Sequence, residues 1–253
     1  MTIPKLNWKN WRHVLVVVAH PDDAEYGLSA AVHEWTRAGI QVDYLLLTHG
    51  EAGMQRVPEE AAVIRAAEQR AACDAVGVTE LVMFNYPDGH LEESIGLRRD
   101  IARQVRRLQP DVVITANYDM EAYGSLNQSD HRVAGVAALD AACDASNRWS
   151  HRELLDVEGY EPHKADLLLV AGASEPTHAV TVDAAAVDAA ITSLHCHEAY
   201  LADLPDHPEP EVFLPEILRA GGESAGAEHG VPFRVFGLGA EPEIDGPVSG
   251  SAQ

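Results

Sequence analysis

The chain has 253 residues, of which 46% are hydrophobic, and a formal net charge of −22. This length is close to the size at which one hydrophobic core stops growing, so a single domain is expected. The acidic charge argues against binding of nucleic acid or a membrane surface, since both present phosphate groups that basic residues must neutralise. Neither an apolar run of the ~18 residues that a membrane helix needs nor a secretory signal is seen, which predicts a cytoplasmic protein.

The first two thirds of the chain alternate apolar, strand-like runs with helical patterns. Strands are predicted at residues 14–19, 42–47, 81–84 and 112–115, and helices at residues 24–38, 59–76 and 95–108. Strands that are apolar throughout are typical of a parallel sheet covered by helices on both faces. Gly39 and Gly77 stand where the first two helices should end in a left-handed residue, and Pro110 follows the third helix.

A polar segment without periodicity, residues 116–128, introduces the second part of the chain. After it we predict a helix at 130–146 with Ser129 or Asp130 as its N-cap, strands at 167–171 and 179–182, and an alanine-rich helix at 183–201. Residues 205–230 are rich in proline, glycine and acidic residues and should be partly irregular, with one helix near 215–220 and an edge strand at 231–236.

These elements predict an α/β fold, a Rossmann-like, doubly wound and mostly parallel sheet with a small irregular C-terminal elaboration. We expect one domain over residues 1–240. Residues 241–253 are predicted to form a disordered tail.

The most informative segment is the turn after the first strand, residues 19–25, with the sequence AHPDDAE. It lies at the carboxyl end of a buried strand, where open α/β sheets bind their ligands. Such turns often bind phosphate, but this one lacks the GxGxxG pattern. Its three carboxylates would repel an anion and attract a cation. His20 and Asp23 are three residues apart and would face the same way on a first helical turn, with Pro21 at its first position. The turn therefore predicts half of a metal site.

The other half is predicted at His131, which begins the helix after the fourth strand and should lie at the same edge of the sheet. Two imidazoles, one carboxylate and an open fourth position suit zinc, although other divalent ions fit as well. Asp22 would project beside these ligands, where it could contact a bound water. Asp130 could orient a ligand or base from behind, or merely cap its helix. The simplest non-functional interpretation is that these residues are only polar strand ends and helix caps.

The AHPDDAE turn resembles the signature of the PIG-L / LmbE-like deacetylases, which are zinc hydrolases of N-acetylated sugars. Other segments are similar to this family in the same order: THGEAG at 48–53, RAAE at 65–68 followed by VGV at 76–78, PDG at 87–89, QPDVV at 109–113, and a late histidine-bearing helix at 183–200. The resemblance covers roughly residues 12–200.

The resemblance implies a Rossmann-like fold whose metal is held by His20, Asp23 and His131. It implies that Asp22 is the general base that activates the attacking water. It also implies that Arg65 and Asp88 contact the substrate.

One departure from the family concerns the third ligand, which commonly occurs as HPDH. Here the sequence is QSDH, so Gln128 stands where the family has a histidine that helps to stabilise the transition state. Either the Gln128 amide donates in its place, or Tyr123, His178 or His197 takes this role. This indicates a divergent branch of the family.

These observations predict metal-dependent hydrolysis of an amide, most simply N-deacetylation of an N-acetylglucosamine-like sugar or a related small-molecule conjugate. An amidase acting on a thiol–sugar conjugate is an alternative. A non-catalytic sugar- or nucleotide-binding module would explain the sheet but not Asp22, and an iron oxygenase with two histidines and one carboxylate finds no support in the α/β pattern. The substrate and the oligomeric state, including a homo-oligomer, are left open.

Overall fold

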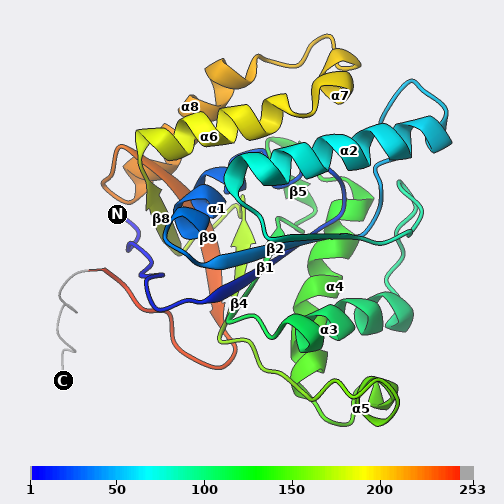
Figure 1. The fold of residues 1–253 in the computed structure, drawn as a ribbon. Helices are drawn as coiled ribbons and strands as arrows, with labels where there is room; N and C mark the ends of the chain where they lie inside the picture. The colour runs from blue at the N-terminus through cyan, green and yellow to red at the C-terminus, as the bar shows by residue number, and fades with distance from the viewer. Residues whose placement is uncertain (1, 246–253) are drawn as a thin grey trace, which may run out of the picture.

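The computed structural model describes residues 2–245 and shows a central seven-stranded sheet with helices on both faces (Figure 1). In chain order the strands of this sheet are β1 (His13–Val18), β2 (Gln41–Leu46), β3 (Glu80–Met83), β4 (Val112–Ala116), β7 (Leu167–Ala171), β8 (His178–Val182) and β9 (His229–Gly237). Their spatial order is β3-β2-β1-β4-β7-β9-β8. The five strands from β3 to β7 pair in parallel, whereas β9 is antiparallel to β7 and β8. The predicted mostly parallel α/β fold is confirmed.

The helices form two layers around this sheet (Figure 1). One layer contains α1 (Leu28–Arg37), α2 (Pro58–Val76), α6 (Ala184–His195), α7 (Glu198–Ala202) and α8 (Pro210–Ser224), and the other contains α3 (Ile95–Leu108), α4 (Ser129–Ser146) and α5 (Arg152–Asp156). In β1, Val14 and Val16 belong to the core under the first layer, while Leu15 and Val17 belong to the core under the second. Because successive side chains of a strand point to opposite faces, a strand covered on both faces is apolar throughout.

The first helix differs from its prediction. It starts at Leu28 and not at residue 24, so the assignment of Pro21 to the first helical position is wrong. Residues 21–27 form turns, in which Asp22 and Gly27 have left-handed backbone conformations with φ angles of 84° and 117°. The Asp22 N–H group donates to the Gln69 side chain on α2 at 2.9 Å. A contact with another helix therefore overrides the helical tendency of this segment.

The end of the chain also corrects the prediction. The strand expected at an edge of the sheet over residues 231–236 is β9, and it lies between β7 and β8. Val231 and Phe233 are buried, and both sides of the β9 backbone pair with neighbouring strands. The edge position on this side of the sheet is taken by β8.

Local features of the second half differ as well. The N-cap of α4 is Gln128 and neither Ser129 nor Asp130, and the helix predicted at residues 183–201 is divided into α6 and α7. The polar segment 116–128 contains a short hairpin of β5 (Glu121–Ala122) and β6 (Ser125–Leu126), and the one-turn helix α5 was not predicted.

The expected tail over residues 241–253 is described only as far as Asp245. Within this stretch the Glu243 carbonyl accepts a hydrogen bond from Asn7, and the Asp245 N–H group donates to Lys5. Residues 246–253 lie outside the described residues, so the domain end at residue 240 stays a prediction.

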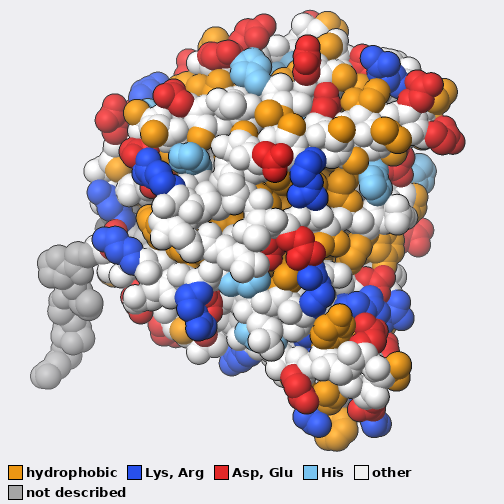
Figure 2. Space-filling view, in the orientation of Figure 1, with side chains coloured by type: hydrophobic (Ala, Val, Ile, Leu, Met, Phe, Trp, Pro, Cys, Tyr) orange, Lys and Arg blue, Asp and Glu red, His pale blue; other side chains and the backbone are white. Residues whose placement is uncertain are grey.

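The hydropathy of the helices and the distribution of surface charge bear on which partners the protein can bind. Within residues 2–245, no helix is both long and apolar enough to cross a membrane. Acidic and basic side chains are intermingled over the face drawn in Figure 2, without one large basic area on that face.

Candidate metal centre and active site

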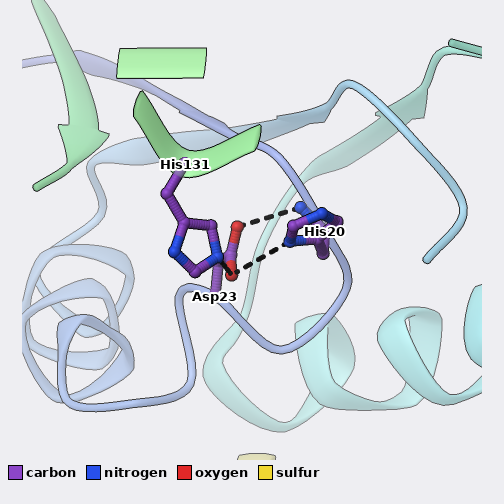
Figure 3. A group of neighbouring side chains, drawn as sticks. All are labelled: His20, Asp23 and His131. Carbon is purple, nitrogen blue, oxygen red and sulfur yellow. Dashed lines mark hydrogen bonds and ion pairs between the residues drawn. The ribbon is translucent and has the colours of Figure 1, made fainter. Parts of the chain in front are cut away.

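Three predicted ligands converge at the carboxyl edge of the sheet. His20 and Asp23 follow β1, His131 lies in the first turn of α4, and their ligand atoms all lie within 4.8 Å of one another. Nε2 of His131 is 3.1 Å from Oδ1 of Asp23, and Nδ1 of His20 is 3.7 Å from the same oxygen. Figure 3 shows the two imidazoles on either side of the carboxylate. Residues over a hundred positions apart therefore form one potential ligand set.

The turn itself orients the Asp23 carboxylate. Its Oδ2 atom accepts hydrogen bonds from the backbone N–H groups of Ala19 at 3.0 Å and His20 at 2.9 Å. This leaves Oδ1 to face the two imidazoles. Burial alone would raise the pKa of Asp23, but His20 and His131 lower this pKa well below its usual range. The carboxylate is therefore charged and directed, as a metal ligand must be.

The far nitrogen of each histidine ring has its own acceptor. Nε2 of His20 lies 3.0 Å from Asp88 Oδ1 and 3.4 Å from Asp130 Oδ2, and Nδ1 of His131 lies 3.1 Å from Asn127 Oδ1. Such partners fix the tautomer and orientation of metal-binding imidazoles. Burial would lower the pKa of His20, but Asp23, Asp130 and Asp88 together raise it well above its usual value.

Asp88 and Asp130 form a second acidic cluster with His20. Both carboxylates already accept backbone hydrogen bonds, Asp88 from Ala52 at 2.7 Å and Asp130 from Gly89 at 2.8 Å. Their distances to His20 are those of hydrogen bonds. This cluster is therefore suited to orienting His20, whereas the first group lines the pocket through all three of its residues and is the better candidate for holding a metal.

Asp22 is buried beside the ligands and held by α2. Its Oδ1 atom is 2.5 Å from the Arg65 guanidinium, and its N–H group donates to Gln69. Gln69 in turn donates to Glu25 at 3.2 Å, so a chain of buried polar groups supports the left-handed Asp22 backbone. Burial raises the pKa of Asp22, although Arg65 opposes this effect.

Arg65 serves as a buried anchor as well as a pocket residue. Its guanidinium donates to the carbonyl groups of Pro21 and Gly50 and lies 3.9 Å from the centroid of the Tyr200 ring. A Cβ atom at Gly53 would approach the guanidinium to 2.5 Å, so the glycine-bearing loop leaves space for this side chain. Most of its donors are thus already used within the protein.

A pocket of about 740 Å³ opens at this centre. Every predicted site residue except Asp130 lines it, namely His20, Asp22, Asp23, Arg65, Asp88, Gln128 and His131. Asp130 lies behind His20, consistent with an orienting position.

The four candidates for the missing helper histidine are separated by the structure. Gln128 and Tyr123 line the pocket. His178 and His197 are outside the pocket lining, and His197 is completely buried with Nε2 3.6 Å from Glu25.

Sequence reasoning missed several pocket or support residues. Gln69 carries no motif, but it lies four residues after Arg65 on α2, so helical spacing could have placed it on the same face. Tyr26, Tyr200 and Phe213 line the pocket, and no local pattern in their segments indicated this.

Comparison with known proteins identifies the family of the chain. Residues 15–142 match the family model "PIG-L: GlcNAc-PI de-N-acetylase". A diacetylchitobiose deacetylase of Thermococcus kodakarensis is 29% identical over 155 residues, covering 60% of this chain and 57% of that protein. A protein named probable N-acetyl-alpha-D-glucosaminyl L-malate deacetylase 2 of Bacillus anthracis is 36% identical over 141 residues, covering 53% and 60%. The chain spans about three fifths of the length of these relatives.

A solved structure extends the likeness to almost the whole fold. The N,N'-diacetylchitobiose deacetylase of Pyrococcus horikoshii superposes with a TM-score of 0.81 at 23% identity, covering 91% of this chain and 85% of that one. Since the family model covers half of the chain and includes the β1 turn and the start of α4, the chain belongs to the PIG-L (LmbE-like) deacetylase family.

Proposed function

We propose that this protein is a metal-dependent amide hydrolase that removes the N-acyl group of an amino sugar or a related small molecule. The observation that carries the proposal is the convergence of His20, Asp23 and His131 next to the buried carboxylate of Asp22, inside one pocket. The relatives are named as deacetylases of N-acetylated sugars, which supports the same bond and a similar substrate class here.

The donor set fits a divalent cation. Two imidazole nitrogens and one carboxylate oxygen are the ligands of catalytic zinc sites that leave a fourth position open. The second nitrogen of each imidazole has a hydrogen-bond acceptor that orients the ring, as such sites need. We propose zinc as the resident ion. When bound, it would polarise the amide carbonyl and make water a stronger nucleophile at neutral pH.

Asp22 is proposed as the general base. Its Oδ1 atom is held by Arg65, which leaves Oδ2 to accept a proton from the attacking water. The raised pKa that burial causes makes this carboxyl a better base than an exposed aspartate. The same oxygen then passes the proton to the nitrogen of the departing amine.

The oxyanion that forms during attack requires a hydrogen-bond donor from the protein. The Gln128 amide and the Tyr123 hydroxyl are both on the pocket wall and are the two proposed donors. A donor of this kind contributes about 2.7–4 kcal/mol to the stability of a transition state in other enzymes.

Asp130 and Asp88 both contact Nε2 of His20 but differ in their access to the pocket. We propose that Asp130 is a positioning residue for His20, since it contacts Nε2 and is buried away from the pocket. Asp88 contacts the same nitrogen but also lines the pocket, so it can accept a hydrogen bond from a substrate hydroxyl group. Arg65 is proposed to bind substrate mainly by shaping the pocket, because its guanidinium is engaged by the protein.

The test is a panel of N-acetylated amines supplied to the zinc-loaded protein, with release of free amine and carboxylate measured. We expect activity that disappears with a chelator and returns with zinc. The panel should include thiol–sugar amides, which separate a deacetylase from an amidase of conjugates. Binding of sugars without metal-dependent amine release would overturn the proposal and support a non-catalytic module.

A further inference from the structure

The pocket has two chemically different ends. Its charged and histidine side chains are the ligand set, Asp22 next to it, and the groups that contact these residues, since Asp88 contacts His20 and Arg65 contacts Asp22. Gln128 stands three residues before His131. Among the other described residues that line it, no side chain carries a charge, an amide or an aliphatic hydroxyl group. Apart from three tyrosines, this remaining wall is hydrocarbon, aromatic ring and glycine.

The sheet order separates these two ends in space. Asp88 follows β3 and Arg65 lies on α2, so the polar end lies toward β2 and β3. The apolar wall is built from the other side, by Ala171 at the end of β7, Val231 on β9 and Ile217 on α8. The ligand set after β1 and at the start of α4 belongs to the polar end and, in the strand order, is its part nearest to the apolar wall.

The apolar wall is formed and accessible. Phe213 stacks on Tyr26 with their ring centroids 5.8 Å apart, and Tyr26 also bonds to His207 at 2.8 Å, so these rings are held in place. Ile217 lines the pocket with 45% of its surface exposed, although a large aliphatic side chain is normally buried. Apolar surface of this kind is stabilised by an apolar ligand.

Hydroxyl-rich or anionic groups do not suit this wall. A sugar, polyol or carboxylic acid buried there would lose its hydrogen bonds to water and would find only tyrosine hydroxyl groups among the lining side chains to replace them. A hydrocarbon group loses nothing and gains about fourfold in binding for each buried methylene group.

We propose that the acyl group of the substrate is a hydrocarbon chain longer than acetyl, of about four to eight carbons, that lies along this wall. The inference rests on the proposed amide hydrolysis. The two substituents of a planar amide point in opposite directions. If the amine half carries sugar hydroxyls toward Asp88 and Gln128, the acyl half extends toward Ile217 and Val231. Water then cleaves the bond between carbonyl carbon and nitrogen, its hydroxyl going to the acyl carbon and its proton to the amine, so that a fatty carboxylate and a free amine leave.

The first measurement compares glucosamines that carry acetyl, butanoyl, hexanoyl or octanoyl groups, with the zinc-loaded protein. We expect kcat/KM to rise at least about tenfold from acetyl to hexanoyl, since four methylene groups are added. The second measurement titrates acetate and hexanoate into the same protein by calorimetry, where tighter binding of hexanoate requires no turnover.

A pair of variants on one helix tests the location. Ile217→Asn places an amide in the pocket wall and should flatten the dependence on chain length in both measurements. Val212→Asn is the matched control, because Val212 is a β-branched residue on α8 that is 57% exposed but absent from the pocket lining. It should keep the wild-type chain-length dependence.

The possible results are distinguishable. Hydrolysis of the N-acetyl compound without a gain from longer acyl groups would overturn this inference and leave the proposed function intact. A gain seen only when an octyl group is attached to the sugar as a glycoside would also overturn it, since the wall would then bind the other end of the substrate. Absence of hydrolysis for every compound, with equal binding of both carboxylates, would reject the two proposals together.

Discussion

The turn at residues 19–25 and the β5–β6 hairpin both bring residues to the pocket, but they are built differently. In the turn, Asp22 is supported by Arg65 and Gln69, and Asp23 by two backbone N–H groups. In the hairpin, Tyr123 and Leu126 are 66% and 70% exposed. The turn is thus preorganised by buried partners, whereas the hairpin has few. Preorganised charge contributes most to catalysis, so we expect substitutions in the turn and its supports to have the larger effects.

The largest effect is expected from His131→Ala. This change removes one of the three proposed ligands. Loss of a residue that only supports a metal ligand already lowers metal affinity by up to about 100-fold, so zinc affinity should fall by more than this. Metal content after dialysis and activity should be lost together. Stoichiometric zinc retained in this variant would show that the ligand set is wrongly assigned.

Asp22→Asn should separate chemistry from metal binding. The amide is nearly the same size but cannot accept the proton, so kcat should fall by about 10²–10⁴-fold while zinc content is kept. Measured turnover near that of the wild-type protein would exclude Asp22 as the base.

Gln69→Leu tests whether the support of the turn matters at a distance from the reaction. Loss of the acceptor for the Asp22 N–H group should allow the left-handed turn to move, and a shift of about 1 Å can lower kcat by about 10²-fold. KM and zinc content should change little. Unfolding should become easier by about 1–3 kcal/mol, because buried polar groups lose their partner.

Gln69→Glu is the matched control, since its Oε1 atom can still accept from Asp22 while the donation to Glu25 is lost. Recovery of kcat in this variant, compared with Gln69→Leu, would assign the effect to the bond with Asp22. Equal loss in both variants would indicate a general effect on packing.

Tyr123→Phe tests the hairpin. We expect kcat to fall by about tenfold, less than the loss of about 10²–10³-fold for a rigid oxyanion donor, because the hairpin is exposed and Gln128 offers a second donor. Leu126→Ala is the control on the same hairpin, as Leu126 is exposed and outside the pocket lining. An equally large fall in kcat for Leu126→Ala would show that the effect comes from the conformation of the hairpin.

The smallest effect concerns stability of the metal-free protein. The pKa of His20 is raised in the folded state, so its stabilising contribution is complete below the unfolded pKa of about 6.5 and is lost as pH rises through the folded value. Thermal unfolding should therefore occur at lower temperature as the pH increases above about 6.5. His20→Gln should remove much of this dependence, and a slope unchanged in that variant would assign it to other groups.

The repeat of apolar runs and helical patterns was sufficient to predict the parallel part of the sheet. It was not sufficient for β9, which was expected at an edge, because the position of an antiparallel strand depends on which neighbours it can pair with and not on its own residues. Asp130 shows the same limit at the site. Its sequence position was compatible with either a helix cap or a group that orients a ligand or base, and only the structure shows that its carboxylate accepts from Gly89 and Leu91 of another loop and contacts His20.

The sequence by itself determined the kinds of groups at the site, namely two histidines and two adjacent aspartates, because these chemical types stand in a local pattern at the ends of predicted strands. Only the tertiary structure decided how they act together. The orientation of Asp22 depends on Gln69 and Arg65 of α2, and the apolar wall depends on α8 and β9. Contacts between elements distant in the chain set both features, and no local pattern of residues encodes such contacts.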